Sequence, residues 1–152
     1  RLKYINDNFG HAAGDDAIKE TSECVSKALN PDEFVARMGG DEFAAVLILS
    51  EVGRLGRFIR SVRSNFKEIN ESGKYEFELS CSIGTCELNN WHGVMDCMSK
   101  ADKAMYLEKK AKKAAQDEWK SMSKEEKAEW REKKKQNDSK SKTLKESKEK
   151  IC

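Results

Sequence analysis

The stretch Arg37-Met38-Gly39-Gly40-Asp41-Glu42-Phe43 lies between two apolar runs, at 34–38 and 43–49. Adjacent glycines permit the positive φ angles of a tight turn, so the pattern predicts a β-hairpin that turns at Gly39-Gly40. The second run is nearly all apolar, which is typical of a central strand covered on both faces. The stretch therefore indicates an antiparallel sheet, and the rest of the chain is interpreted around it.

Helical and strand-like patterns flank the hairpin. Apolar residues recur at helical spacing over 14–29 and again over 50–69, which predicts one helix on each side. Residues 75–83 alternate between polar and apolar, which predicts a strand with one buried face, and Gly84 then marks a bulge or a close backbone approach. A last helix is expected from Val94. This order of elements predicts an α+β fold with mostly antiparallel strands.

Charge divides the 152-residue chain into an acidic body and a basic tail. Residues 1–108 carry 13 basic and 18 acidic side chains, whereas residues 109–152 carry 16 and 9. We expect one domain over 1–110, followed by a Lys/Glu-rich tail over 111–152. Within the tail, a capping pattern at Ser123 to Glu126 predicts a helix over about 124–135, and the composition beyond 136 predicts disorder.

Composition excludes several classes of protein. No stretch is apolar for long enough to span a membrane, so we expect no membrane segment in this chain. The five cysteines are odd in number and form no C-x-x-C pair, which argues against a zinc site or a disulfide framework and favours a reducing, cytoplasmic compartment. Glutamates interrupt the lysine clusters of the tail, so we expect a solvated charged helix and no specific nucleic-acid partner.

The hairpin turn carries the first candidate site. Asp41 and Glu42 follow two glycines that leave the backbone bare, and carboxylates beside bare backbone suit Mg²⁺ bound with a phosphate substrate. The alternative is an ordinary Gly-Gly-Asp turn with solvated acids. The turn by itself leaves both interpretations open.

Two further stretches carry candidate ligand contacts. Asn6 and Asp15 flank the start of the first predicted helix, where an amide and a carboxylate can bind the edge of a guanine base. The alternative is that Asp15 caps the helix and Asn6 makes a turn. Lys103 can reach a phosphate from the last predicted helix, although a helical lysine is ordinarily just solvated.

Together the three stretches resemble the diguanylate cyclase, or GGDEF-domain, family. The resemblance covers roughly residues 1–110, and the order and spacing of its motifs agree with the family. It rests on four motifs: Lys3-x-Ile5-Asn6-Asp7-x-Phe9-Gly10-His11-x-x-Gly14-Asp15, Arg37-x-Gly39-Gly40-Asp41-Glu42-Phe43, Ser80-x-Ser82-Ile83-Gly84 and Ala101-Asp102-Lys103-Ala104-Met105-Tyr106.

The resemblance implies a palm-like fold of the adenylate-cyclase and ferredoxin-like type, with a central antiparallel sheet flanked by helices. It implies the condensation of two GTP into cyclic di-GMP with release of two pyrophosphates. Two Mg²⁺ or Mn²⁺ ions assist the reaction between the facing domains of a homodimer. It also implies an upstream sensor domain outside this chain, and a full-length protein that could be anchored to a membrane.

The same resemblance assigns roles by position. It places Asp41 and Glu42 as metal ligands and catalytic residues, with Glu42 also a candidate base. The remaining expected GTP contacts are Asn6, His11, Asp15, Gly39, Gly40 and Lys103.

Several positions depart from the family pattern. The first strand and its metal-binding Asp would precede Arg1, so we expect an N-terminal truncation. Asn30 and Glu33 stand where an Arg-x-x-Asp feedback site often lies, so we expect that site to be absent. Leu107 replaces a phosphate-binding Arg, and a lysine run from Lys109 replaces the usual Gly-Arg-Asn ending. These departures favour an alternative, a regulatory domain that binds GTP without turnover.

Overall fold

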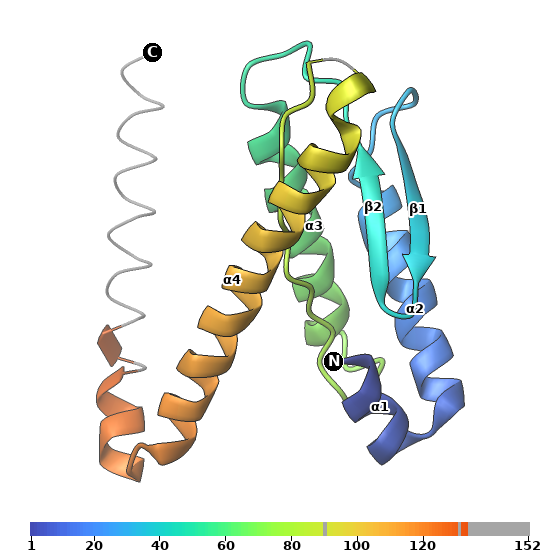
Figure 1. The fold of residues 1–152 in the computed structure, drawn as a ribbon. Helices are drawn as coiled ribbons and strands as arrows, with labels where there is room; N and C mark the ends of the chain where they lie inside the picture. The colour runs from blue at the N-terminus through green and yellow to red at the C-terminus, as the bar shows by residue number, and fades with distance from the viewer. Residues whose placement is uncertain (90, 131, 134–152) are drawn as a thin grey trace, which may run out of the picture. The chain divides into compact units, whose positions relative to one another are not determined.

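The computed structural model describes residues 1–89, 91–130 and 132–133 (Figure 1). These residues fall into two compact units, Arg1–Cys81 and Ser82–Cys152, and each unit is described by itself. Among the described residues, no helix combines the length and the apolar character that crossing a membrane requires.

Helices and a hairpin build the first unit. Its elements are α1 (Leu2–Phe9), α2 (His11–Ser26), β1 (Phe34–Gly39), β2 (Glu42–Val46) and α3 (Arg54–Glu71). α1 packs against α2, and α2 contacts both α3 and β1, so α2 is the central element of the unit (Figure 1). The helices predicted over 14–29 and 50–69 are confirmed as α2 and α3, with shifted ends.

The core of the first unit lies among its three helices and an extended segment after α3. Phe58, Val62 and Phe66 recur every four residues on α3, so they line one face of that helix. α1 was not predicted, although Ile5 is buried on it and packs toward α2. The buried apolar side chains are Ile5, Ala17, Cys24, Val25, Phe58, Val62, Phe66, Phe77 and Leu79.

The predicted hairpin is confirmed, but its second arm is shorter than predicted. β1 and β2 pair antiparallel with a bulge between Arg37 and Gly39, and the Arg37 guanidinium donates to the Gly40 carbonyl at 2.8 and 3.0 Å. β2 ends at Val46, and the prediction of a central strand extending to 49 is wrong in this structure. Within the described residues β2 has only β1 as a neighbour, so Val46 and Ile48 remain substantially exposed.

The strand predicted over 75–83 is an extended segment without a strand partner among the described residues. Its alternation is nevertheless real, because Phe77 and Leu79 are buried and their neighbours are exposed. The Asn70 side chain takes the place of a neighbouring strand: its Oδ1 accepts from the Leu79 N–H at 2.8 Å and its Nδ2 donates to the Leu79 carbonyl at 2.9 Å. The alternation of polar and apolar residues therefore indicates here that one face of the segment is buried, and not that the segment pairs with another strand.

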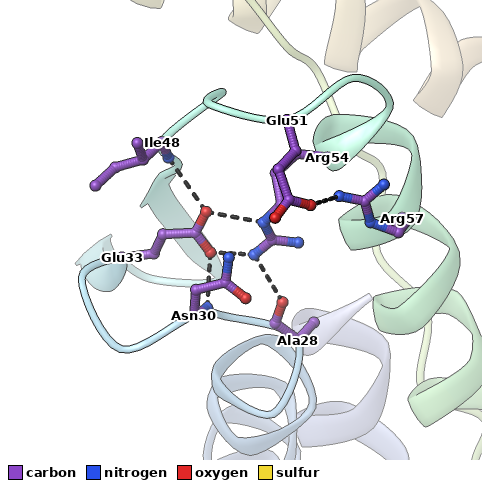
Figure 2. Close-up of polar contacts among 7 residues, drawn as sticks. All are labelled: Ala28, Asn30, Glu33, Ile48, Glu51, Arg54 and Arg57. Atoms are coloured by element: carbon purple, nitrogen blue, oxygen red, sulfur yellow. Dashed lines mark hydrogen bonds and ion pairs between the residues drawn. The ribbon is translucent and has the colours of Figure 1, made fainter.

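A buried carboxylate joins the hairpin to the helices around it (Figure 2). Glu33, just before β1, accepts hydrogen bonds from the guanidinium of Arg54, the first residue of α3, and from the backbone N–H groups of Asn30 and Ile48. Arg54 also donates to the Ala28 carbonyl at 3.0 Å, beyond the end of α2. The hydrogen-bonded pair of Glu33 and Arg54 thus connects the ends of α2 and β2 to the start of α3.

These contacts determine the titration of Glu33. The hydrogen bonds from Arg54 outweigh the cost of burial, and with the two backbone donors they lower the Glu33 pKa from 4.5 to about 2. The side chain is only 1% exposed. The carboxylate is therefore charged in the folded protein at any pH near neutrality.

The second unit consists of an extended segment, a 3₁₀ turn and a long helix. η1 (Trp91–Gly93) leads into α4 (Val94–Ser121), which confirms the predicted last helix and continues past 110. The Ile83 N–H donates to the Glu108 carboxylate at 3.2 Å, and a Cβ on Gly84 would lie 1.8 Å from the Ala101 carbonyl oxygen. Gly84 therefore marks a close backbone approach. The predicted domain end near 110 stays a prediction.

The start of the tail follows its sequence pattern. The Ser123 N–H donates to Glu126, and the Glu126 N–H donates to Ser123 Oγ, which is the predicted capping box at the start of a helix over 124–130. The Trp119 and Trp130 rings pack edge to face across this turn, with centroids 5.1 Å apart. The predicted helix end at 135 and the disorder expected beyond 136 lie outside the described residues.

Glu33→Gln should destabilise the first unit strongly, by roughly 3–5 kcal/mol, because it leaves the Arg54 guanidinium buried without its counter-charge. Chemical unfolding at neutral pH measures the loss. Glu51→Gln is the matched control, since Glu51 pairs with Arg57 at the surface and should contribute under about 1 kcal/mol. Equal effects of the two substitutions would contradict this account.

The same carboxylate predicts an acid transition. Its folded pKa lies below its unfolded pKa, so its stabilisation is complete above about pH 4.5 and disappears as the pH falls toward about 2. Unfolding measured across this range should show a steeper loss of stability for the unsubstituted chain than for Glu33→Gln. If stability falls with pH in the same way in both proteins, Glu33 does not cause the acid transition.

Gly84→Ala should destabilise the second unit by about 1–3 kcal/mol, because the added methyl group would collide with the backbone of α4 at Ala101. Gly93→Ala is the control, since a Cβ there meets only Leu88 at an ordinary 3.6 Å. Thermal unfolding followed by circular dichroism compares the two variants, and an unchanged midpoint for Gly84→Ala would refute the close approach.

Candidate functional site

The hairpin turn presents two adjacent carboxylates at the surface. Asp41 follows Gly40, whose φ of 51° lies in the left-handed region, and Glu42 begins β2. Asp41 Oδ2 lies 3.9 Å from the backbone amine of Arg1, and its side chain is 54% exposed. The chain therefore enters α1 directly beside the turn, as the position of the N-terminus in Figure 1 also shows.

Asn6 lies further along α1, about 7 Å from Arg1 along the helix axis. Its Oδ1 atom is buried and has no hydrogen-bond partner within the described part of the chain. Buried polar atoms are nearly always paired, so this amide oxygen keeps an unused capacity to accept a hydrogen bond.

Gly14 on α2 makes the position of Asn6 possible. A Cβ on Gly14 would lie 1.8 Å from Asn6 Oδ1 and 3.3 Å from Leu2 Cδ1, so only glycine allows α1 to approach α2 this closely. Asp15 is the next residue and is exposed, and His11 lies one turn earlier near the same face of α2. The structure thus brings Asn6 near the residues predicted to bind guanine with it.

Lys103 belongs to the second unit and is described within that unit. It is exposed on α4, where it lines a shallow depression together with Asp102, Tyr106 and Leu107. Leu107 is 64% exposed beside it. Lys103 is therefore accessible to a solution anion from this face of α4.

The chemistry of the hairpin turn fits a hard cation, and the group of donors is small. Asp41 and Glu42 supply oxygen ligands, which Mg²⁺ prefers, and Mg²⁺ is commonly bound by one or two carboxylates together with substrate phosphates. No group of three or more metal-ligating side chains forms among the described residues. Binding at this turn would therefore depend on oxygen atoms from water or a phosphate ligand.

Sequence reasoning missed one contribution to this site and one buried ion pair elsewhere in the first unit. The clearance that Gly14 gives Asn6 was not predicted, although a glycine inside a helical pattern is a usable signal of close packing. The buried Glu20 carboxylate was also missed: it pairs with Lys74 and accepts from the Tyr75 hydroxyl at 3.0 Å, and these contacts lower its pKa despite burial. It anchors the segment after α3 to α2.

Comparison with known proteins identifies the family of this chain. Residues 1–115 match the family model described as diguanylate cyclase, GGDEF domain. The chain belongs to this GGDEF domain family.

Similarity to individual proteins agrees with this family assignment. The chain is similar to the diguanylate cyclase DosC of Escherichia coli K12, at 28% identity over 123 residues, covering 80% of this chain and 27% of that protein. It is also similar to the probable diguanylate cyclase DgcE of the same strain (34% identity, 72% of this chain, 10% of that protein). Similarity extends to the signaling protein YkoW of Bacillus subtilis (31%, 75%, 15%). The chain thus spans about a quarter or less of these relatives.

Gly14→Ala should destabilise the packing of α1 on α2, since its methyl group overlaps Asn6 Oδ1. The loss should be much smaller in an Asn6→Ala background, which gives a coupling of about 1 kcal/mol or more in a double-mutant cycle. Urea unfolding of the four proteins measures it.

Gly56→Ala is the control, because Gly56 lies in α3 beside only the flexible end of Arg60, and it should be neutral or stabilising by up to about 1 kcal/mol. Additive effects of Gly14→Ala and Asn6→Ala would contradict the contact.

Proposed function

We propose that this chain is the GTP-binding half-site of a diguanylate cyclase. Two such domains face each other in a homodimer, and the 3′-hydroxyl of one GTP attacks the α-phosphate of the other. Each attack forms one phosphodiester bond and releases one pyrophosphate, so two attacks give cyclic di-GMP. The observation that carries the proposal is the intact Gly39-Gly40-Asp41-Glu42 turn beside Arg1, the residue that precedes α1.

The residues of the first unit divide between base and phosphates. Asn6 offers its unpaired buried Oδ1 to a donor on the guanine edge, and Asp15 offers an exposed carboxylate close by. His11, on the same part of α2, joins them in the nucleotide site. Gly39 and Gly40 leave the backbone open to the nucleotide, since a Cβ at either would meet no atom within 4 Å.

The carboxylates of the turn provide the ligands for a metal ion. Asp41 and Glu42 would hold Mg²⁺ or Mn²⁺, which when bound stabilises negative charge on the reacting phosphate oxygens. Glu42 is also the candidate to accept the proton of the attacking hydroxyl. Lys103 contributes a mobile positive charge for a phosphate.

The hairpin belongs, in this proposal, to a larger palm-like antiparallel sheet. Phe34, Val46 and Ile48 are 57%, 39% and 50% exposed, which is much apolar surface for strands of a stable domain. A further strand beside the hairpin would cover it, as would the first strand expected before Arg1. The upstream sensor, the cytoplasmic setting and the domain end near 110 are part of the same proposal.

Product feedback at the Arg-x-x-Asp position is not part of the proposal. Glu33 occupies the acidic position there, and its carboxylate is already bound by Arg54 and two backbone N–H groups. A carboxylate so paired has no exposed oxygen for a nucleotide ligand. The network instead supports the hairpin.

One alternative function is supported by a specific observation. Leu107 stands exposed beside Lys103, at the position where the family resemblance predicts a phosphate-binding Arg. A domain with this departure could bind GTP and regulate a partner without turnover. The two functions differ in whether product forms, and both require GTP binding.

Asp41→Asn in the full-length dimeric protein should reduce cyclic di-GMP formation by about 100-fold or more, because it removes a charged ligand of the Mg²⁺ that would balance the charge of the reacting phosphates. Product is quantified by chromatography after incubation with GTP and Mg²⁺. Glu51→Gln, which alters an exposed carboxylate outside the site, should leave the rate unchanged.

No product from a verified dimer of the unsubstituted protein would refute turnover. Retained GTP binding in that sample would then favour the regulatory function, whereas absent binding would refute both.

A further inference from the structure

Two cysteines of the second unit approach each other without being bonded. Cys86 lies in the extended segment before η1, and Cys97 lies in the first turn of α4. Their thiols are in hydrogen-bonding contact, which is the main reason that the pKa of the Cys97 thiol is raised. Both residues are reduced and partly exposed.

Contacts on both sides of the pair fix this approach. Before Cys86, Gly84 lies against the backbone of α4 at Ala101 and Met105, and the Ile83 N–H donates to Glu108. After it, the Leu88 side chain approaches Gly93, just before α4. The segment 83–88 therefore runs antiparallel to α4, and the Cys86–Cys97 contact lies in register between these neighbours.

The surroundings of the pair leave it open to small oxidants. Besides its contact with Cys97, the Cys86 thiol donates to the neighbouring Glu87 carbonyl at 3.5 Å. Cys24, by contrast, is only 1% exposed in the first unit. Thiol oxidation requires access to the sulfur, so the two partly exposed thiols are more open to an oxidant than Cys24.

We propose that Cys86 and Cys97 are a redox modification site, which a hydroperoxide converts reversibly into an intramolecular disulfide. One thiol reduces hydrogen peroxide to water and becomes a sulfenic acid. The sulfur of the other thiol then attacks the sulfenic sulfur, the S–S bond forms and a second water leaves. Two thiols and one peroxide thus give one disulfide and two waters, and a dithiol reductant restores the thiols.

The disulfide would connect the segment 83–88 covalently to the first turn of α4. Lys103 lies six residues after Cys97 on the same helix, so the link would tie the segment to the start of the helix that presents Lys103. The inference does not depend on the proposed function, since it concerns covalent chemistry that the chain performs without GTP. It is also compatible with a reducing compartment, where disulfides are typically transient.

Peroxide treatment of the intact chain, followed by alkylation and digestion before aspartates, tests the site. Cleavage at Asp96 and Asp102 separates Cys97, on the peptide 96–101, from Cys81 and Cys86, on the peptide 41–95. We expect these two peptides to be linked after oxidation and released by dithiothreitol. Linking should also become faster as the pH rises, because the thiolate is the reactive form.

Serine variants identify which cysteine forms the disulfide with Cys97. Cys86→Ser should reduce the linked product by about tenfold or more, and the matched control Cys81→Ser should leave it within about twofold. Cys97→Ser is a second loss variant, in which Cys86 should remain open to alkylation after mild oxidation. Circular dichroism establishes that each variant is folded.

Each remaining outcome overturns the proposal. Linking that persists in Cys86→Ser assigns Cys97 to another partner. Oxygen addition to both sulfurs without linking, or no reaction at either sulfur, shows that the two thiols do not form a disulfide site.

Discussion

The buried contact between Glu33 and Arg54 is the constraint on which the hairpin depends. Glu33 accepts four hydrogen bonds, from Asn30 in the loop after α2, from Ile48 just beyond β2 and from Arg54 at the start of α3. A two-stranded hairpin alone is barely stable in water. Because the carboxylate closes the base of this hairpin, the turn with Asp41 is held at a defined place beside α1.

Close packing of α1 on α2 supplies the second part of the site. Gly14 lets Asn6 lie where its amide oxygen is buried and unpaired, while the start of the same helix approaches Asp41. One short helix thus lies beside both the proposed base-binding position and the proposed phosphate-binding turn. In the proposed site, a donor on the nucleotide base would pair this oxygen.

The features predicted from the sequence were those that local chemistry determines. The Gly39-Gly40 turn, the helices α2, α3 and α4 and the Ser123–Glu126 capping box follow from φ requirements, helical spacing and capping. The short helix α1 was missed, and β2 was extended too far because an apolar run does not reveal how many neighbours a strand has.

Long-range contacts were beyond prediction. Nothing local shows that Glu33 meets Arg54, or that Asn70 rather than a strand would satisfy Leu79. Residue chemistry alone left the candidate site residues open between a binding site and ordinary surface, and the family resemblance favoured the site. Their chemical roles stay predictions.

Nucleotide selectivity of the chain tests the central claim most directly. Calorimetric titration with GTP and with ATP, both in Mg²⁺, should show binding of GTP at least about tenfold tighter than ATP, a difference of about 1.4 kcal/mol. Asn6→Ala should remove most of that preference while the fold is retained. Equal binding of the two nucleotides, or selectivity unchanged in Asn6→Ala, would contradict the assignment of α1 and α2 as the guanine site.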